Sequence, residues 1–275
     1  MLFRSITDHI EYRANKKILI SDHNKSYEIA KAQGDAIGML VIKGAEITRQ
    51  KPLGHLNALF IQDANKLERP DAIEAIDEAM KQGGFILWNH PGWPDDKSTM
   101  YPIHRELIEK QKIHGIEVFN GWEAYPKVID WCQEFNLAPI SNSDIHYTSA
   151  NLYRGKLMRP MTLVFAKDYT EQGVKDAMFS GRTLAFYNNV LSGDEGLLKS
   201  LIKASLSVRV INEKNGMIEI TNLSDIAYEI KYGEYMYPMP LYPNQVLRAT
   251  IPTGTDVEFS NCICGKDRHI TLKLW

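Results

Sequence analysis

The chain has 275 residues, 44% hydrophobic and 24% charged, a length and composition that suit one large globular domain plus a small one. Its 32 basic and 34 acidic side chains give a formal net charge of -2 without a basic stripe, so the charge gives no reason to expect a nucleic-acid partner. No apolar stretch approaches the roughly 20 residues that span a bilayer, so we expect no membrane segment.

Up to about residue 204, short apolar runs alternate with amphipathic stretches, which is typical of an α/β fold. The strand-like runs cover 39–42, 56–61, 85–88, 115–119, 137–140, 162–165 and 183–186. The helical patterns cover 24–37, 71–81, 99–111, 123–135, 170–179 and 194–203. Asp71, directly after Pro70, predicts the N-cap of the second helix.

From about residue 205 the pattern changes to short strands divided by turns rich in Asn, Gly, Ser and Pro. The strand-like segments are 206–211, 217–221, 227–232, 245–251, 256–260 and 269–274. Lys214-Asn215-Gly216 is a hairpin signal. We therefore expect residues 1–204 to form an α/β domain and residues 205–275 a small antiparallel β domain, sandwich-like in character.

The N-terminus and the cysteines leave the cellular compartment open. Residues 1–4 lead straight into Ser5-Ile6-Thr7-Asp8-His9, a predicted strand end that carries ligand-type side chains. No signal peptide is visible in these residues. We expect that a preceding segment has been lost, so cytoplasmic and periplasmic locations both remain open. Cys132 fits a helical core, and Cys262 and Cys264 have a poor spacing for zinc or a disulfide, so all three are interpreted as structural.

Ligand-type side chains follow the apolar runs. Asp8 and His9, Glu46, His90, and Asp144 with His146 each come just after a predicted strand. In a barrel of parallel strands the carboxyl ends converge on one face, where catalytic groups gather. The sequence therefore predicts that these residues meet in one site.

Two candidate ligands, Glu46 and His55, also have an alternative role. Glu46 at a buried strand end is costly unless it is paired or binds metal, and the alternative is an ion pair with Arg49 or Arg13. His55 is either a ligand or a histidine bonded to Asn57. The remaining histidines are expected in surface or capping roles: His23, His104, His114 and His269.

Five short motifs together resemble the PHP (polymerase and histidinol phosphatase) family, in order and in rough spacing. They are Ser5-Ile6-Thr7-Asp8-His9, Gly44-Ala45-Glu46-Ile47-Thr48, Gly54-His55-Leu56-Asn57, Asn89-His90-Pro91-Gly92 and Ser143-Asp144-Ile145-His146. The segment 115–121 also looks similar. The resemblance covers about residues 5–203 and is to bacterial members with an appended C-terminal β domain.

This resemblance implies a distorted (β/α)7 barrel with up to three divalent metals at the carboxyl ends of its strands. Mixed imidazole and carboxylate ligands suit Zn, Mn or Fe better than Ca or Mg alone. The implied metal ligands are His9, Glu46, His55, His90, Asp144 and His146. Among them His90, Asp144 and His146 are taken as catalytic, while Asp8 and Asn57 would orient ligands. The family opens with a His-x-His motif that this chain lacks, so we expect the first strand of the barrel and three ligands to be missing.

The function that follows is hydrolysis of a small phosphate ester, mono- or diester, by metal-activated hydroxide. Arg13, Arg49 and Arg154 could bind the phosphate oxygens, or be solvated surface residues. Trp88, Trp93, Trp122 and Tyr147 could line the pocket or pack in the core. The alternatives are hydrolysis of another bond such as an amide, and an incomplete barrel that binds metal without catalysis. The oligomeric state stays open.

Overall fold

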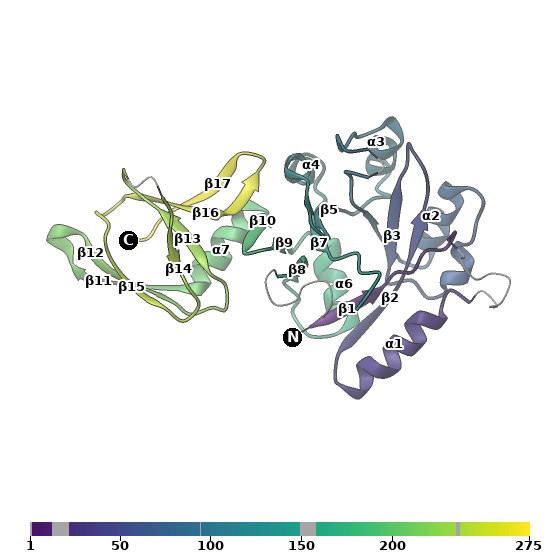
Figure 1. The fold of residues 1–275 in the computed structure, drawn as a ribbon, viewed down its shortest axis with the longest axis horizontal. Helices are drawn as coiled ribbons and strands as arrows, with labels where there is room; N and C mark the ends of the chain where they lie inside the picture. Colours follow the sequence, from purple (N-terminus) through teal and green to yellow (C-terminus); the bar gives the residue numbers. More distant parts are fainter. Residues whose placement is uncertain (1, 13–21, 94, 149–157, 235–236) are drawn as a thin grey trace.

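The computed structural model describes residues 2–12, 22–93, 95–148, 158–234 and 237–275, which form two lobes (Figure 1). The first lobe is built on a seven-stranded mixed sheet in the order β1-β2-β3-β4-β5-β6, with β7 pairing with β5. Its strands are β1 (Phe3–Ile6), β2 (Leu40–Thr48), β3 (His55–Leu59), β4 (Phe85–Trp88), β5 (Gly115–Asn120), β6 (Glu123–Ala124) and β7 (Ala138–Asn142).

The strand directions bring distant residues to one edge of this sheet. β1 runs parallel to β2, and β4, β5 and β7 run parallel to one another, whereas β3 is antiparallel to both of its neighbours, β2 and β4. The carboxyl ends of β1, β2, β4, β5 and β7 therefore share an edge with the amino end of β3. Because β3 is reversed, its first residue, His55, lies at that edge.

The helices of this lobe follow the predicted amphipathic stretches closely. They are α1 (Lys25–Ala36), η1 (Ala64–Leu67), α2 (Ala72–Lys81), α3 (Pro102–Glu109), α4 (Pro126–Phe135) and α6 (Glu171–Phe179). The predicted N-cap of α2 is confirmed, since the Asp71 carboxylate accepts hydrogen bonds from the backbone N–H groups of Ile73 and Glu74 at 2.7 and 3.1 Å. α2 turns Ala75, Ile76 and Ala79 into the core.

The prediction of an α/β fold is confirmed, but a (β/α)7 barrel is not. The chain passes from β2 to β3 through a short turn over residues 49–54 rather than through a helix, and β3 therefore returns antiparallel. Residues 123–124, predicted as the start of a helix, instead form β6, and α4 begins only at Pro126. A tight turn leaves no room for a crossover helix, and without a crossover the strand cannot return parallel.

Two further sheets build the second lobe, and the larger one reaches the first lobe through β8 and β9, which lie beside β7 (Figure 1). A seven-stranded sheet has the order β14-β13-β16-β10-β9-β8, with β17 on β16, and a three-stranded sheet has the order β11-β12-β15. The strands are β8 (Met161–Val164), β9 (Thr183–Tyr187), β10 (Val190–Gly193), β11 (Leu206–Asn212), β12 (Met217–Asn222), β13 (Tyr228–Lys231), β14 (Met239–Leu241), β15 (Val246–Thr250), β16 (Asp256–Gly265) and β17 (Arg268–Lys273). The predicted hairpin is confirmed, because β11 and β12 pair antiparallel around Gly216, whose φ is 71°.

The core of the second lobe extends across the predicted domain boundary. Leu184 and Leu191 of β9 and β10, and Leu198 of α7 (Glu195–Ser205), are buried with side chains of the C-terminal strands such as Phe259. The division at residues 204 and 205 stays a prediction. The two large sheets meet where the Ser141 backbone N–H donates to the Thr162 hydroxyl at 2.9 Å.

Two smaller expectations concern the cysteines and membrane segments. Cys132, Cys262 and Cys264 are all buried free thiols, which agrees with structural roles. Among the described residues, the helices are all too short or too polar to cross a lipid bilayer.

Candidate metal centre

The centre of the site is a carboxylate held between two imidazoles. Glu46 lies near the end of β2, His55 begins β3, and His9 follows β1, where it forms a parallel bridge with Glu46. Glu46 Oε1 lies 2.6 Å from His55 Nδ1 and 3.2 Å from His9 Nδ1. One ligand atom from each residue falls within 4.8 Å of the other two, a spacing suited to a metal ion.

The electrostatics of this trio favour an ionised Glu46. Burial alone would raise the pKa of Glu46, but hydrogen bonds and attraction from His55 and His9 outweigh it and lower the pKa to about 2. The hydrogen bond that Glu46 accepts from His9 raises the pKa of His9 against the effect of its partial burial. The alternative ion pair of Glu46 with Arg49 is not formed, because Arg49 pairs with Glu11.

His90 is held in place by a buried acid that the sequence analysis did not assign. The His90 backbone N–H donates to Glu117 Oε2 at 2.6 Å, and His90 has a φ of 26°, a left-handed conformation that costs energy in a non-glycine residue. Asn120 and Asn142 each donate a side-chain hydrogen bond of 2.7 Å to the same carboxylate. Glu117 thus ties together the ends of β4, β5 and β7.

The signal for Glu117 was available in the sequence. It stands in the otherwise apolar run of β5, which is buried along its whole length. Burial raises the pKa of Glu117 to about 7 although its neighbours donate hydrogen bonds to it. A carboxylate in such a run requires hydrogen bonds, a counter-charge or a metal, and the same reasoning indicated Glu46.

Several buried polar atoms at this edge have no partner among the described residues. They are His55 Nε2, His90 Nδ1, Asn57 Oδ1 and Asn89 Oδ1. Buried nitrogen and oxygen atoms without hydrogen bonds are costly, and imidazole and oxygen donors are the ligands that Zn, Mn and Fe take. The donor set therefore fits a divalent metal. The alternative for His55 is not seen, because its Nδ1 bonds Glu46 and not Asn57.

Asp144 and His146 approach from the loop after β7. The rings of His9 and His146 have centroids 5.7 Å apart, and those of His55 and His90 are 4.8 Å apart, so the predicted histidines do gather at one edge. Asp144 has a φ of 47°, and its backbone carbonyl lies 2.9 Å from His146 Nδ1. Asp144 and His146 are more exposed than Glu46 and stand outside the tight trio. Their assignment as ligands stays a prediction.

The other predicted positions divide between those in the cavity and those used elsewhere. Asn57 lies opposite Glu46 in the register of β2 and β3, and Asp8 also lines the cavity. The Arg49 guanidinium, in contrast, donates to Glu11 and to the Thr48 and Arg69 backbone carbonyls. Its role as a phosphate ligand stays a prediction. Arg13 and Arg154 lie outside the described residues.

The aromatic side chains also separate into two groups. Trp88 is buried in the core, stacked on His104 at a ring distance of 3.7 Å. Trp93 is half exposed and packs on the His55 ring with centroids 4.4 Å apart, so it covers that imidazole. Trp122 and Tyr147 are exposed.

Two of the remaining histidines are wholly or partly buried. His104 is buried, and it caps α3 because its Nδ1 accepts from the Tyr101 backbone N–H at 3.2 Å. His114 Nδ1 accepts from the Ile86 backbone N–H at 2.9 Å, and burial lowers the pKa of His114 to about 4. The capping expectation is thus confirmed for His104, and His114 is a half-buried residue that binds a backbone N–H group.

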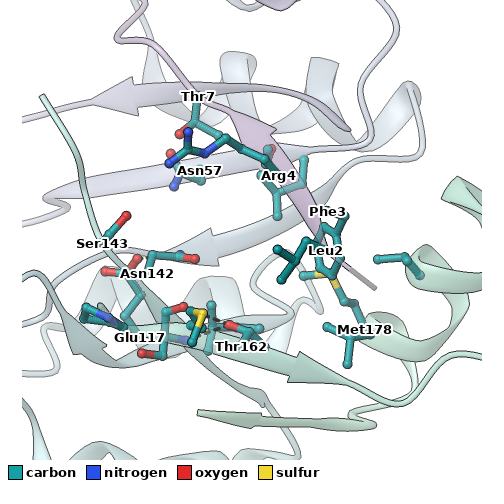
Figure 2. A pocket seen from close by; sticks show the side chains of 18 of the residues that line it. Leu2, Phe3, Arg4, Thr7, Asn57, Glu117, Asn142, Ser143, Thr162 and Met178 are labelled. Atoms are coloured by element: carbon teal, nitrogen blue, oxygen red, sulfur yellow. Dashed lines mark hydrogen bonds between the residues drawn. The ribbon is translucent and has the colours of Figure 1, made fainter. Parts of the chain in front are cut away.

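The cluster opens on a cavity of about 1290 Å³ (Figure 2). Residues 2–9 and 159–169 contribute to its lining, so it runs along the whole of β1. His9, Glu46, Glu117 and Asp144 belong to the lining, together with apolar residues such as Met178. Polar groups that converge on a large, partly apolar cavity are typical of a small-molecule site.

Fold and site together define an α/β protein with a His/Glu/His cluster that could hold a metal ion at the strand ends of a mixed sheet. Neither models of known protein families nor the curated proteins gave a match. A solved structure from Bacteroides vulgatus matches with a TM-score of 0.91 and 35% sequence identity, over 99% of this chain and 85% of that one. It is a two-domain protein containing a predicted PHP-like metal-dependent phosphoesterase. The chain therefore belongs to this PHP-like family, as its motifs indicated.

Proposed function

We propose that this protein hydrolyses phosphate esters with the help of divalent metal ions bound at the edge formed by β1, β2 and β3. The observation that supports it most directly is the convergence of His9, Glu46 and His55 within 4.8 Å. Two buried imidazole nitrogens without a partner among the described residues, His55 Nε2 in this trio and the nearby His90 Nδ1, support it further. The family relationship supports phosphate esters as the substrate class.

The residues of the chain would divide the work. His9, Glu46 and His55 would hold one cation, with His90, Asp144 and His146 completing a set for up to three, of which Zn, Mn or Fe suit the mixed donors. Such cations would supply Lewis acidity, which makes water more acidic and offsets the charge on the phosphate oxygens. No protein nucleophile is then needed.

Neighbouring groups would keep these ligands in place. Glu117 fixes the His90 peptide, while Thr48 Oγ1, 2.7 Å from His9 Nδ1, fixes the His9 ring. Trp93 shields His55 from solvent. Groups that orient a metal ligand in this way raise the affinity of the site for metal and fix the position of the ligand.

The test measures metal content and hydrolysis on the same protein. We expect the purified chain to retain Mn or Zn in elemental analysis and to hydrolyse 4-nitrophenyl phosphate or bis(4-nitrophenyl) phosphate. His90→Ala should abolish this activity, whereas His269→Ala, an exposed position on β17, should leave it unchanged. Retained activity in His90→Ala protein that contains no metal would contradict the proposal.

A substrate panel addresses the two alternatives. Cleavage of 4-nitroanilides without cleavage of either phosphate would favour an amide hydrolase. Stoichiometric metal binding without any turnover would favour a metal-binding module.

A further inference from the structure

Two arginines line the cavity without a partner. Arg4 lies in β1, and Arg159 precedes β8 by two residues. Within the described ranges, neither side chain makes a hydrogen bond, an ion pair or a ring contact. Every other described arginine makes at least one: Arg49, Arg69, Arg105, Arg182, Arg209, Arg248 and Arg268.

The two guanidinium groups bring like charges to the same cavity. Partial burial and the positive charge of Arg159 both lower the pKa of Arg4. Two like charges facing one cavity are unfavourable unless an anion comes between them. Guanidinium groups remain charged at any physiological pH, so the repulsion cannot be removed by loss of a proton.

The Arg4 side chain extends toward the edge that carries the His9, Glu46 and His55 trio (Figure 2). β1 keeps its register with β2 from the pair Arg4–Val41 to the bridge His9–Glu46. Figure 2 shows the Arg4 side chain extending along the strand toward Thr7 and Asn57. Asn57 is the register partner of Glu46, so the Arg4 guanidinium points to the part of the cavity next to the trio.

Arg159 lines the same cavity from a segment that is far from β1 in the chain. It leads into β8, where Thr162 is bonded to Ser141 at the end of β7. The next residue, Asn142, donates to Glu117. Arg159 and Asp144 both belong to the lining of this cavity.

We propose that Arg4 and Arg159 form the anion-binding part of this site and select a dianionic phosphate, so that the substrate is a phosphomonoester and not a phosphodiester. This rests on the proposed function. A terminal phosphate carries a charge of about -1.5 to -2 near pH 7 and exposes three oxygens, whereas a diester carries a single charge. Two planar guanidinium forks match the terminal group, since each can donate two parallel hydrogen bonds to it.

The test compares two esters with the same leaving group. Wild type should favour 4-nitrophenyl phosphate over bis(4-nitrophenyl) phosphate. Arg4→Gln and Arg159→Gln should each lower kcat/KM for the monoester by about tenfold to a hundredfold, mainly through KM, and should change the diester less than about threefold. Arg4→Lys and Arg159→Lys should recover part of the loss, because the charge remains while the fork is lost.

The matched control is Arg248→Gln, which removes one positive charge from the exposed surface of β15, where Arg248 pairs with Glu219. It should leave both esters unchanged. Equal losses for the two esters in Arg4→Gln and Arg159→Gln, or no loss, would overturn the proposal. So would a wild type that prefers the diester.

A binding measurement separates failure of this proposal from failure of the proposed function. Inorganic phosphate is titrated calorimetrically into chelator-treated protein, where hydrolysis plays no part. Wild type and His90→Ala should bind phosphate, and Arg4→Gln and Arg159→Gln should bind at least about tenfold more weakly. Absence of turnover with this binding pattern intact would reject only the hydrolysis. No phosphate binding by wild type, or equal binding by the arginine variants, would reject the arginine pair.

Discussion

Buried amide side chains behave differently in the two lobes of this protein. In the second lobe, buried Asn222 donates to the backbone carbonyls of Ile226, Leu241 and Tyr242, and its Oδ1 accepts from Ser224. Asn261 there is bonded on both sides of its amide as well. In the first lobe, Asn57 and Asn89 are also buried, yet their Oδ1 atoms have no partner in the described structure.

The difference indicates which lobe is built to bind something. A buried amide that is fully bonded organises the chain around it, and one that is left unbonded is costly unless a ligand arrives. The partnerless Asn57 and Asn89 stand beside the partnerless His55 and His90 nitrogens. The hydroxyls of Thr183 and Ser192, in β9 and β10, also lack partners among the described residues, but neither side chain lines the cavity.

The largest expected effect comes from removing the charge at the centre of the first lobe. Glu46→Gln keeps the shape of the side chain but loses the carboxylate that His9 and His55 share. We expect loss of bound metal and a drop in phosphate-ester hydrolysis of about a thousandfold or more. Elemental analysis and steady-state kinetics measure both. Full metal occupancy in the variant would contradict the role given to Glu46.

The second prediction contrasts the two kinds of asparagine directly. Asn222→Ala should lower the free energy of unfolding by about 2 to 4 kcal/mol, because it leaves several buried carbonyl groups without their hydrogen-bond donor. Asn57→Ala should cost less than about 1 kcal/mol, because no hydrogen bond is lost. Urea unfolding measures both variants. Equal destabilisation by the two changes would remove the distinction between the lobes.

A smaller effect is expected from Glu117, which supports His90 without belonging to the trio. Glu117→Gln places an N–H group against the His90 N–H or against the amides of Asn120 and Asn142. We expect metal affinity to fall by about tenfold to a hundredfold, as is usual when a group that orients a ligand is lost. Competition with a metal chelator measures this. Glu123→Gln, at a neighbouring exposed position, should leave the affinity unchanged.

The smallest effect is the pH dependence of stability due to His114, a structural histidine of the first lobe. Its pKa is about 4 in the folded protein, below the 6.5 of a free imidazole, so the unfolded chain binds more protons between these values. The stability it confers is complete above pH 6.5 and is lost as the pH falls toward 4, by at most about 1.4 kcal/mol per pH unit. His114→Gln should flatten this slope in urea unfolding at several pH values. His269→Gln should keep it, and an unchanged slope in His114→Gln would contradict the assignment.

The sequence predicted the elements of the first lobe well because their patterns are local. The runs that became β4 and β5 and the cap at Asp71 depend on neighbours within one turn or one strand. The direction of β3 was not predictable in this way. Whether a strand returns parallel depends on the turn that precedes it and on the sheet it joins, and periodicity carries neither.

The same limit applied to the candidate site. Glu46 and His55 could be singled out because ligand-type residues stand beside apolar runs, and the structure brings them into contact. Arg4 and Arg159 could not be, because 155 positions of chain separate them and each looks like an ordinary surface arginine in its own segment. Sequence reasoning chose Arg49 instead, whose guanidinium is used by Glu11.

By itself, the sequence determined the α/β class of the first lobe, its membership of a motif-defined family and the identity of the residues that could carry metal chemistry, because side-chain type and local periodicity are written in the chain. The tertiary structure decided the reversal of β3, the sharing of Glu46 between His9 and His55, and the place of Glu117 under His90. These depend on which strand ends meet, and only the packed sheet brings together atoms from distant parts of the chain.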